Sequence, residues 1–279
     1  MTQWQSGEVQ ANGLRLHYTR TGGDGPAVVL AHGFSDDGTC WTPLAEALAG
    51  EYDVIMPDAR GHGRSEAPEG PYGTAEQAAD LAGLIAALGL TRPAVLGHSM
   101  GAATTLVLAG THPDVPRAIL LEDPGPSWMP PPPPPPPGTP DRWAGMRDWV
   151  AGLPGKTREE LIAGQRAATP GWSEAELGPW ADSKLRLSPH VLNRADAAPV
   201  DWPATLRRIA CPVLLITADP ARGGIITDES AAALQALVPH ARRVHIEGAG
   251  HSVRRDQFAP YLAAVRAFLR ETSTPDRAA

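Results

Sequence analysis

A serine with a glycine two residues before it and another two residues after it, Gly97-x-Ser99-x-Gly101, lies between two segments of different character. Residues 94–96 are apolar and predict a short buried strand, whereas residues 102–109 predict a helix. A turn that joins a strand directly to a helix is too tight for side chains at its flanking positions, so glycines stand there. It also raises the serine above the edge of the sheet in a strained conformation. The pattern predicts an α/β fold with a nucleophilic serine.

Apolar strands alternate with helices along most of the chain. Strands that are apolar on both faces are typical of a parallel sheet covered by helices on both sides, whereas residues 14–19 alternate as a half-exposed antiparallel strand does. We therefore expect a mostly parallel sheet. The predicted buried strands are residues 27–31, 52–56, 94–96, 118–121, 213–217 and 244–246. The predicted helices are residues 42–48, 74–88, 102–109, 228–237 and 260–270.

One segment interrupts this alternation. Residues 124–205 are rich in Pro, Trp and polar residues, contain six of the eight tryptophans and show no buried-strand run. We interpret them as an inserted, mainly helical lid, with the α/β core divided between residues 1–123 and 206–279. The lid contains the proline run 130–137, which predicts a polyproline II strap, and a disordered segment or an SH3-type ligand are the alternatives.

A serine hydroxyl is a poor nucleophile until a base takes its proton, and nine histidines are available for that role. His251 follows a predicted strand in the glycine-rich loop 248–250, at the sheet edge where Ser99 is expected. We predict His251 as the general base. His98, directly beside the serine, is expected to point away across the turn.

The base needs a carboxylate that holds its other ring nitrogen, and the chain order offers two positions for it. Asp219 follows the strand 213–217, and Asp123, or its neighbour Glu122, follows the strand 118–121. We favour Asp219, because Asp123 opens the inserted segment and Pro124 comes immediately after it. Asp123 remains the alternative acid.

The negative oxygen of a tetrahedral intermediate needs two backbone N–H donors. Met100 follows the nucleophile and is predicted to supply one, and Phe34, after His32-Gly33, is predicted to supply the other. The Phe34 side chain would then line the acyl pocket. Tryptophans of the inserted segment offer apolar walls, so Trp128 and Trp143 are predicted to contact the substrate.

Together these motifs resemble the α/β-hydrolase superfamily over essentially the whole chain. They are His32-Gly33-Phe34, the loop 58–65, the 97–101 turn, the Asp219 loop and Gly250-His251. The resemblance implies an eight-stranded, mostly parallel sheet, a Ser-Asp-His triad in that chain order and a helical cap, with a structural rather than catalytic loop at 58–65. With serine at position 99, the chain resembles the esterase, C–C hydrolase and cofactor-free haloperoxidase-like branches, which share a serine nucleophile. The epoxide hydrolases and haloalkane dehalogenases carry Asp at that position, so the serine argues against both.

These features predict a carboxylesterase-like hydrolase that cleaves a moderately hydrophobic small-molecule ester through an acyl-enzyme, with no metal and no organic cofactor. Amide, lactone or C–C bond cleavage by the same triad is the alternative within the enzyme class. A hydrolase-fold ligand receptor with slow turnover is the alternative from another class. Arg254 and Arg255, just after His251, are expected to start a solvated helix, and a carboxylate-binding pair is the alternative.

Composition limits the partners. The net charge of −7 does not suggest a phosphate-binding surface, so no nucleic-acid partner is expected, and no apolar run approaches the length of a membrane span. The N-terminal residues show no signal-peptide pattern, which predicts a cytoplasmic protein. Cys40 and Cys211 are expected to be free thiols.

Overall fold

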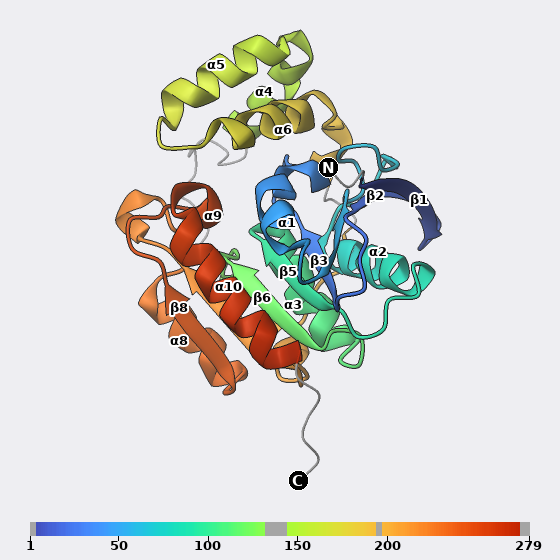
Figure 1. Ribbon diagram of the computed structural model, residues 1–279, viewed down its shortest axis with the longest axis vertical. Helices are drawn as coiled ribbons and strands as arrows, with labels where there is room; N and C mark the ends of the chain where they lie inside the picture. The colour runs from blue at the N-terminus through green and yellow to red at the C-terminus, as the bar shows by residue number, and fades with distance from the viewer. Residues whose placement is uncertain (1–3, 132–143, 194–196, 274–279) are drawn as a thin grey trace.

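The computed structural model describes residues 4–131, 144–193 and 197–273. It contains one sheet of eight strands in the order β1-β2-β4-β3-β5-β6-β7-β8 (Figure 1). β1 pairs with β2 and β2 with β4 in antiparallel fashion, and all the other pairs are parallel. The strands are β1 (Gln5–Ala11), β2 (Leu14–Arg20), β3 (Ala27–Ala31), β4 (Asp53–Pro57), β5 (Ala94–His98), β6 (Ala118–Glu122), β7 (Val213–Thr217) and β8 (Ala241–His245).

Helices cover both faces of this sheet. Alternate residues of β3 enter different cores: Val28 and Leu30 pack with the helices on one face, and Val29 packs on the other. The first core is shared with α1 (Thr42–Leu48) and α10 (Phe258–Ser273). The second is shared with α2 (Thr74–Ala87), α3 (Met100–Thr111) and α8 (Asp228–Leu237). The predicted mostly parallel, doubly covered sheet is confirmed.

The register of the central strands decides which loops meet. Ala31 of β3 lies opposite Gly97 of β5, and His98 lies opposite Glu122 of β6. Because β4 lies on one side of β3 and β5 on the other, the chain reverses direction across the sheet at this point, where α/β folds open a crevice at the carboxyl ends of their strands. The segments after β3, β5 and β6 therefore meet at one edge.

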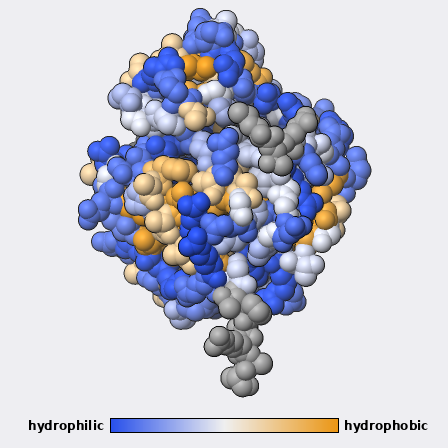
Figure 2. Space-filling model, viewed as in Figure 1, coloured by the Kyte–Doolittle hydropathy of each residue, from blue (hydrophilic) through white to orange (hydrophobic). Residues whose placement is uncertain are grey.

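A separate group of helices stands beyond that edge (Figure 1). It consists of α4 (Ala144–Gly152), α5 (Arg158–Ala168) and α6 (Glu174–Leu185), and 3-10 turns lie at Leu153–Gly155 and Pro189–Leu192. Leu153, Leu161 and Ala181 form a small core of their own. Hydrophilic side chains cover most of the outer surface of these helices in the view of Figure 2.

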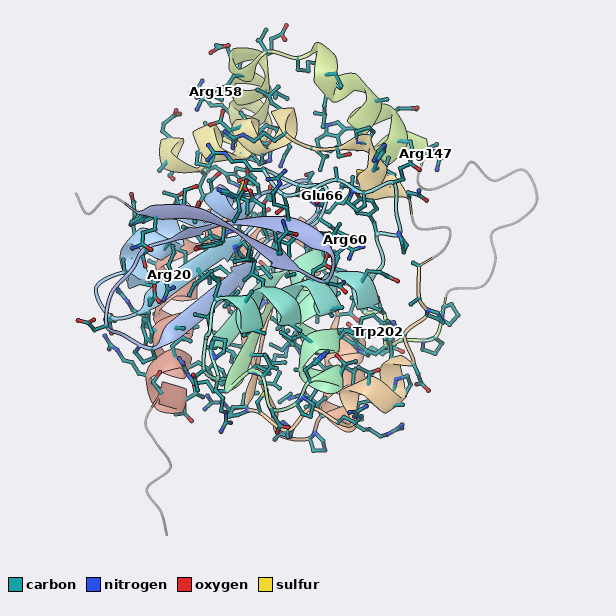
Figure 3. The ribbon with its side chains drawn as sticks, turned by 90° about the vertical axis from the view of Figure 1, so that its right-hand side faces the viewer. Arg20, Arg60, Glu66, Arg147, Arg158 and Trp202 are labelled. Atoms are coloured by element: carbon teal, nitrogen blue, oxygen red, sulfur yellow. The ribbon has the colours of Figure 1, made fainter. Side chains whose placement is uncertain are left out.

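The two ends of the inserted segment pack with the body of the protein. Trp128 lies in the core beneath α2, α3 and α8, and Leu206 of α7 (Trp202–Leu206) lies in the same core. Figure 3 shows Trp202 on the body, away from the outer helices. The separate helices thus occupy only the middle of residues 124–205. Of the predicted proline strap, residues 132–137 lie outside the described residues.

The loop at residues 58–65 is held by buried polar contacts. The carboxylate of Asp58 accepts hydrogen bonds from the backbone N–H groups of Gly38 at 2.7 Å and Arg64 at 2.8 Å. The Arg60 guanidinium pairs with Asp80 of α2 at 2.5 Å. These contacts tie the loop after β4 to the sheet and to α2. In the described part of the chain, none of the helices has the length and apolar character needed to cross a membrane.

Candidate active site

Ser99 stands at the turn between β5 and α3. Its backbone has φ 50° and ψ −110°, a combination that strains any residue with a Cβ. Its N–H donates to the carbonyl oxygen of Glu122 at 2.9 Å, which ties the turn to the end of β6. The geometry is that of the strained strand-to-helix turn predicted from the sequence.

The glycines of the turn are required by close approach. A Cβ added to Gly97 would lie 2.3 Å from the carbonyl oxygen of Gly101, and one added to Gly101 would lie 2.2 Å from that of Ala31. Neither distance is sterically allowed. The start of α3 therefore presses directly against the end of β3, and this brings Ser99 next to the loop that follows β3.

Three side chains form a continuous hydrogen-bonded series. The Ser99 hydroxyl lies 3.0 Å from Nε2 of His251, and Nδ1 of His251 lies 2.7 Å from Oδ2 of Asp123. With Nδ1–H donating to the carboxylate, Nε2 carries the lone pair that can accept the serine proton. The His251 side chain is 33% exposed and the Asp123 side chain 0%, so the series runs from an accessible hydroxyl to a buried acid.

Asp123 is fixed from two directions. It follows β6 directly with φ 42°, a left-handed conformation that Asp tolerates better than most residues. Its carboxylate also accepts the backbone N–H groups of Ile225 at 2.8 Å and Ile226 at 3.0 Å. These hydrogen bonds fix the orientation of the buried carboxylate, so that Oδ2 faces His251.

Asp219, the acid favoured from the sequence, is not the partner of His251 in the structure. Its carboxylate accepts hydrogen bonds from Nε2–H of His245 and from the N–H of Gly248, both at 2.8 Å. Both contacts lower the pKa of Asp219, and the hydrogen bond from Gly248 has the larger effect. The correction has a simple geometric reason. Asp123 follows β6 immediately, beside Ser99, whereas Asp219 comes two residues after the end of β7.

His98 has a position that sequence reasoning missed. Its ring packs against that of His251 with centroids 4.8 Å apart, and its Nε2–H donates to the His251 carbonyl oxygen at 3.0 Å. Burial, with the nearby charges of His251 and Arg254, holds the pKa of His98 well below its ordinary value. A neutral His98 therefore supports the loop that carries His251, through the ring contact and the hydrogen bond to its main chain.

The predicted oxyanion residues lie beside the nucleophile. The Gly33 carbonyl accepts Nδ1–H of His32 at 2.8 Å and the N–H of Asp36 at 3.2 Å. The same peptide plane carries the N–H of Phe34 on its opposite side, so fixing the carbonyl also fixes that donor. A Cβ on Gly33 would lie 3.5 Å from the Ser99 Cβ, which shows how closely this loop approaches the nucleophile.

The predicted substrate residues have different fates. Trp128 is 6% exposed, and its indole N–H donates to the Ser230 carbonyl at 2.8 Å, so it is a core residue and not an open wall of the site. Trp143 lies outside the described residues. Phe34 is half-buried, and its ring meets the edge of His62 at 6.2 Å between centroids.

Comparison with known proteins decides the family. Residues 26–253 match the profile of the family described as "alpha/beta hydrolase fold". The chain belongs to the α/β hydrolase family. This confirms the fold and the family expected from the sequence motifs, and it makes the chain a hydrolase.

Several relatives of this α/β hydrolase share most of its length. It is 32% identical to an N-formylmaleamate deformylase of Pseudomonas putida over 94% of this chain and 96% of the relative. The crystal structure of an N-formylmaleamic acid deformylase from Pseudomonas putida has a TM-score of 0.77 at 26% identity, covering 94% of this chain and all of that one (100%). An enol-lactonase from Burkholderia xenovorans has a TM-score of 0.73 at 26% identity, covering 95% and 100%.

Near the Ser99–His251–Asp123 series of this α/β hydrolase lies a buried ion cluster, a term we use for six side chains. They are Asp36, Glu122, Glu176, Lys184, Arg254 and Arg255. Arg254 and Arg255 belong to α9 (Val253–Asp256), and both are buried, so the expected solvated helix start is wrong. With three acids and three bases the cluster has no formal net charge, which is how buried ions are tolerated.

Asp36 is the centre of the buried ion cluster. Its carboxylate lies 2.7 Å from Nζ of Lys184, 3.0 Å from Arg255 and 3.5 Å from Arg254. Burial alone would raise its pKa, but the positive charges of Arg255, Lys184 and Arg254 outweigh burial and hold the pKa well below its ordinary value. Within the described ranges, no group of three or more His, Cys, Asp or Glu side chains is arranged to hold a metal ion.

Proposed function

We propose that this α/β hydrolase is a serine amidohydrolase that removes a small acyl group, of the formyl or acetyl class, from an amide nitrogen. The observation that carries the proposal is the series Ser99–His251–Asp123, with contacts of 3.0 and 2.7 Å. The choice of an amide rests on the deformylase that shares 32% identity over nearly the whole chain.

The first half of the reaction forms an acyl-enzyme. His251 takes the hydroxyl proton as Ser99 Oγ attacks the carbonyl carbon, and Asp123 stabilises the imidazolium that results. The N–H groups of Phe34 and Met100 bind the negative oxygen, aided by the N-terminus of α3. The C–N bond then breaks as Nε2–H of His251 delivers its proton to the nitrogen, so the product leaves as a neutral amine or amide.

The second half releases the acid. Water takes the place of the departed nitrogen group, His251 removes its proton, and the hydroxyl adds to the acyl carbon. The tetrahedral intermediate collapses, Ser99 Oγ recovers the proton from His251, and the carboxylic acid is freed. In this proposal, helices α4 to α6 form the lid that closes over the site and selects the small-molecule substrate.

A second candidate is the ester-type reaction expected from the sequence. It is favoured by the structural likeness to an enol-lactonase, since a lactone is a cyclic ester. The same triad, without rearrangement, would attack a lactone or an open-chain carboxylic ester. The two candidates differ in the leaving group, so product analysis separates them.

The test uses one substrate from each class. N-formylmaleamate is supplied and formate release is followed with a coupled dehydrogenase, in parallel with p-nitrophenyl acetate, p-nitrophenyl butyrate and an enol-lactone. Ser99→Ala is the control for every substrate. Formate release above about 1 s⁻¹ that is lost in Ser99→Ala supports the amidohydrolase. Faster turnover of the lactone or the esters, by a hundredfold in kcat/KM, would instead establish the second candidate. Tight binding without turnover of any substrate would favour the receptor alternative.

A further inference from the structure

We propose that Lys184, on lid helix α6, is a positioning residue that holds the oxyanion loop, defined here as residues 33–36. The inference rests on the proposed function, because it assumes that the Phe34 N–H binds the negative oxygen. It assigns to the outer helices a part in building the catalytic geometry, in addition to covering it.

Lys184 reaches the oxyanion loop from α6, in the group of helices outside the sheet edge. Its side chain is 1% exposed, and Nζ donates to the Ser35 carbonyl at 2.9 Å and to Oδ1 of Asp36 at 2.7 Å. Its third hydrogen bond joins Ser183 Oγ at 3.1 Å. All three protons of the ammonium are thus used, and two of them hold the oxyanion loop.

The oxyanion loop needs such a restraint because it is strained. Ser35 has φ 66°, a left-handed conformation that few residues with a Cβ adopt. Strain of this kind persists only where the surroundings over-determine the backbone. Lys184 bonds the carbonyl of that same residue, and the N–H of Asp36, which belongs to the same peptide unit, closes the turn onto the Gly33 carbonyl at 3.2 Å. Loss of the ammonium would let this turn relax, and the Phe34 N–H would move with it.

Removal of the ammonium alone leaves the rest of the buried ion cluster paired. Asp36 would keep Arg255 at 3.0 Å and Arg254 at 3.5 Å, so it would not become an isolated buried charge. These two arginines follow His251 by only a few residues. The lid, the oxyanion loop and the segment after the general base therefore converge on one carboxylate, and Lys184 is the lid's contribution.

The decisive experiment compares wild type with Lys184→Met, which keeps the length of the side chain but removes its donors. Steady-state kinetics on the amide substrate give kcat and KM. Labelling of Ser99 by a fluorophosphonate gives a second-order rate constant that needs no knowledge of the substrate. Its phosphoryl oxygen occupies the oxyanion position. We expect kcat and the labelling rate constant to fall together, by about 10- to 100-fold, with KM within about twofold.

A matched control lies in the same group of helices. Arg158 of α5 pairs with Asp182 of α6 at 2.7 Å, and it is exposed at the outer surface, as Figure 3 shows. Arg158→Met also removes a lid cation but touches no part of the oxyanion loop, so we expect wild-type kcat and labelling rate. Lys184→Gln, which keeps one short donor, should fall between wild type and Lys184→Met and serves if the methionine variant does not fold.

The outcomes separate the inference from the proposed function. Unchanged labelling in a folded Lys184→Met, or a rise in KM alone, would show that Lys184 does not position the oxyanion donor. A wild type that is labelled at Ser99 but cleaves no amide would refute the substrate class, while the labelling rates would still decide the role of Lys184. A wild type that resists labelling would overturn both.

Discussion

Nδ1 of His251 lies 2.7 Å from Oδ2 of Asp123, the residue that follows β6, whereas Asp219, two residues beyond β7, pairs with His245 instead. Ser99 and Asp123 follow residues that face each other across β5 and β6, so the two side chains stand at one level of adjacent strands. His251 then closes the series from the loop after β8.

This relationship predicts unequal effects of two isosteric substitutions. Asp123→Asn should lower kcat by about 10⁴-fold, because the imidazolium loses its stabilising charge and the amide can favour the wrong tautomer. Asp219→Asn is the matched control. It can still accept the Gly248 N–H, so kcat should change by less than about threefold, within the range of a surface substitution. Turnover measured with the same substrate decides the point, and inactivation by the Asp219 change alone would contradict the assignment.

The strained backbone of Ser99 predicts that a substitution which relieves the strain will raise stability even though it abolishes activity. Ser99→Gly removes the Cβ that makes φ 50° and ψ −110° unfavourable, whereas Ser99→Ala keeps it. Both variants should be inactive, but the glycine variant should be more stable than the alanine variant by about 1–2 kcal/mol. Urea unfolding of the two proteins measures this difference. Equal stabilities would mean that the turn stores no strain.

The low pKa of Asp36 predicts how stability changes in acid. A carboxyl whose folded pKa lies below its unfolded value stabilises the protein above the unfolded pKa, and that contribution is lost as pH falls through the folded pKa. The free energy of unfolding of wild type should therefore decrease as pH falls below the ordinary Asp value of 3.8. Asp36→Asn should be less stable by about 3–5 kcal/mol at pH 7, because three buried cations lose their shared partner.

Comparing wild type with Asp36→Asn over a range of pH isolates the contribution of the Asp36 charge to stability. The gap in unfolding free energy between wild type and Asp36→Asn should narrow as the pH drops below 3.8, because the Asp36 carboxyl takes up a proton in the unfolded chain before it does so in the folded protein, which favours unfolding of wild type only. Denaturant titrations from pH 7 to pH 3 give the gap directly. A gap that stays constant over that range would show that Asp36 is not charged in the folded protein.

Both cysteines are free and buried, and this predicts their reactivity. Burial raises the pKa of Cys40 to about 12 and that of Cys211 to about 11. Since the thiolate is the reactive form, neither should react with Ellman's reagent at pH 8 while the protein is folded. Two equivalents should react in denaturant. Rapid reaction of the native protein would show that the segment around one of them opens easily.

Much of the fold could be predicted because its signals are local. Apolar runs gave the central strands, and the helix predicted at residues 42–48 matches α1. The Ser99 turn was predictable too, since tight strand-to-helix geometry requires its glycines. His251 followed from its place after the last strand. In each case a short stretch of sequence carries the whole constraint.

The errors concern long-range placement. Asp219 and Asp123 both follow apolar strands, and only the register of β5 and β6 shows which one reaches His251. Arg254 and Arg255 read as solvated cations because their partners, Asp36, Glu122 and Glu176, are scattered over the chain. Trp128 reads as part of the lid because nothing in its neighbourhood indicates that its indole bonds Ser230 on α8.

The loop after β7 supports Asp123, the acid of the proposed reaction, through its main chain. The N–H groups of Ile225 and Ile226 hold the Asp123 carboxylate, and every amino acid except proline supplies the same N–H. Selection acting on this support would leave the exposed side chain at 225 free to vary, while forbidding proline and any insertion that shifts the backbone. At 226 packing adds a second constraint, because Ile226 is 0% exposed in the core. An aligned column would then look variable at position 225, although the main chain there holds the Asp123 carboxylate. Where a loop acts through its main chain, its permitted length and the exclusion of proline indicate its function better than the identity of its residues does.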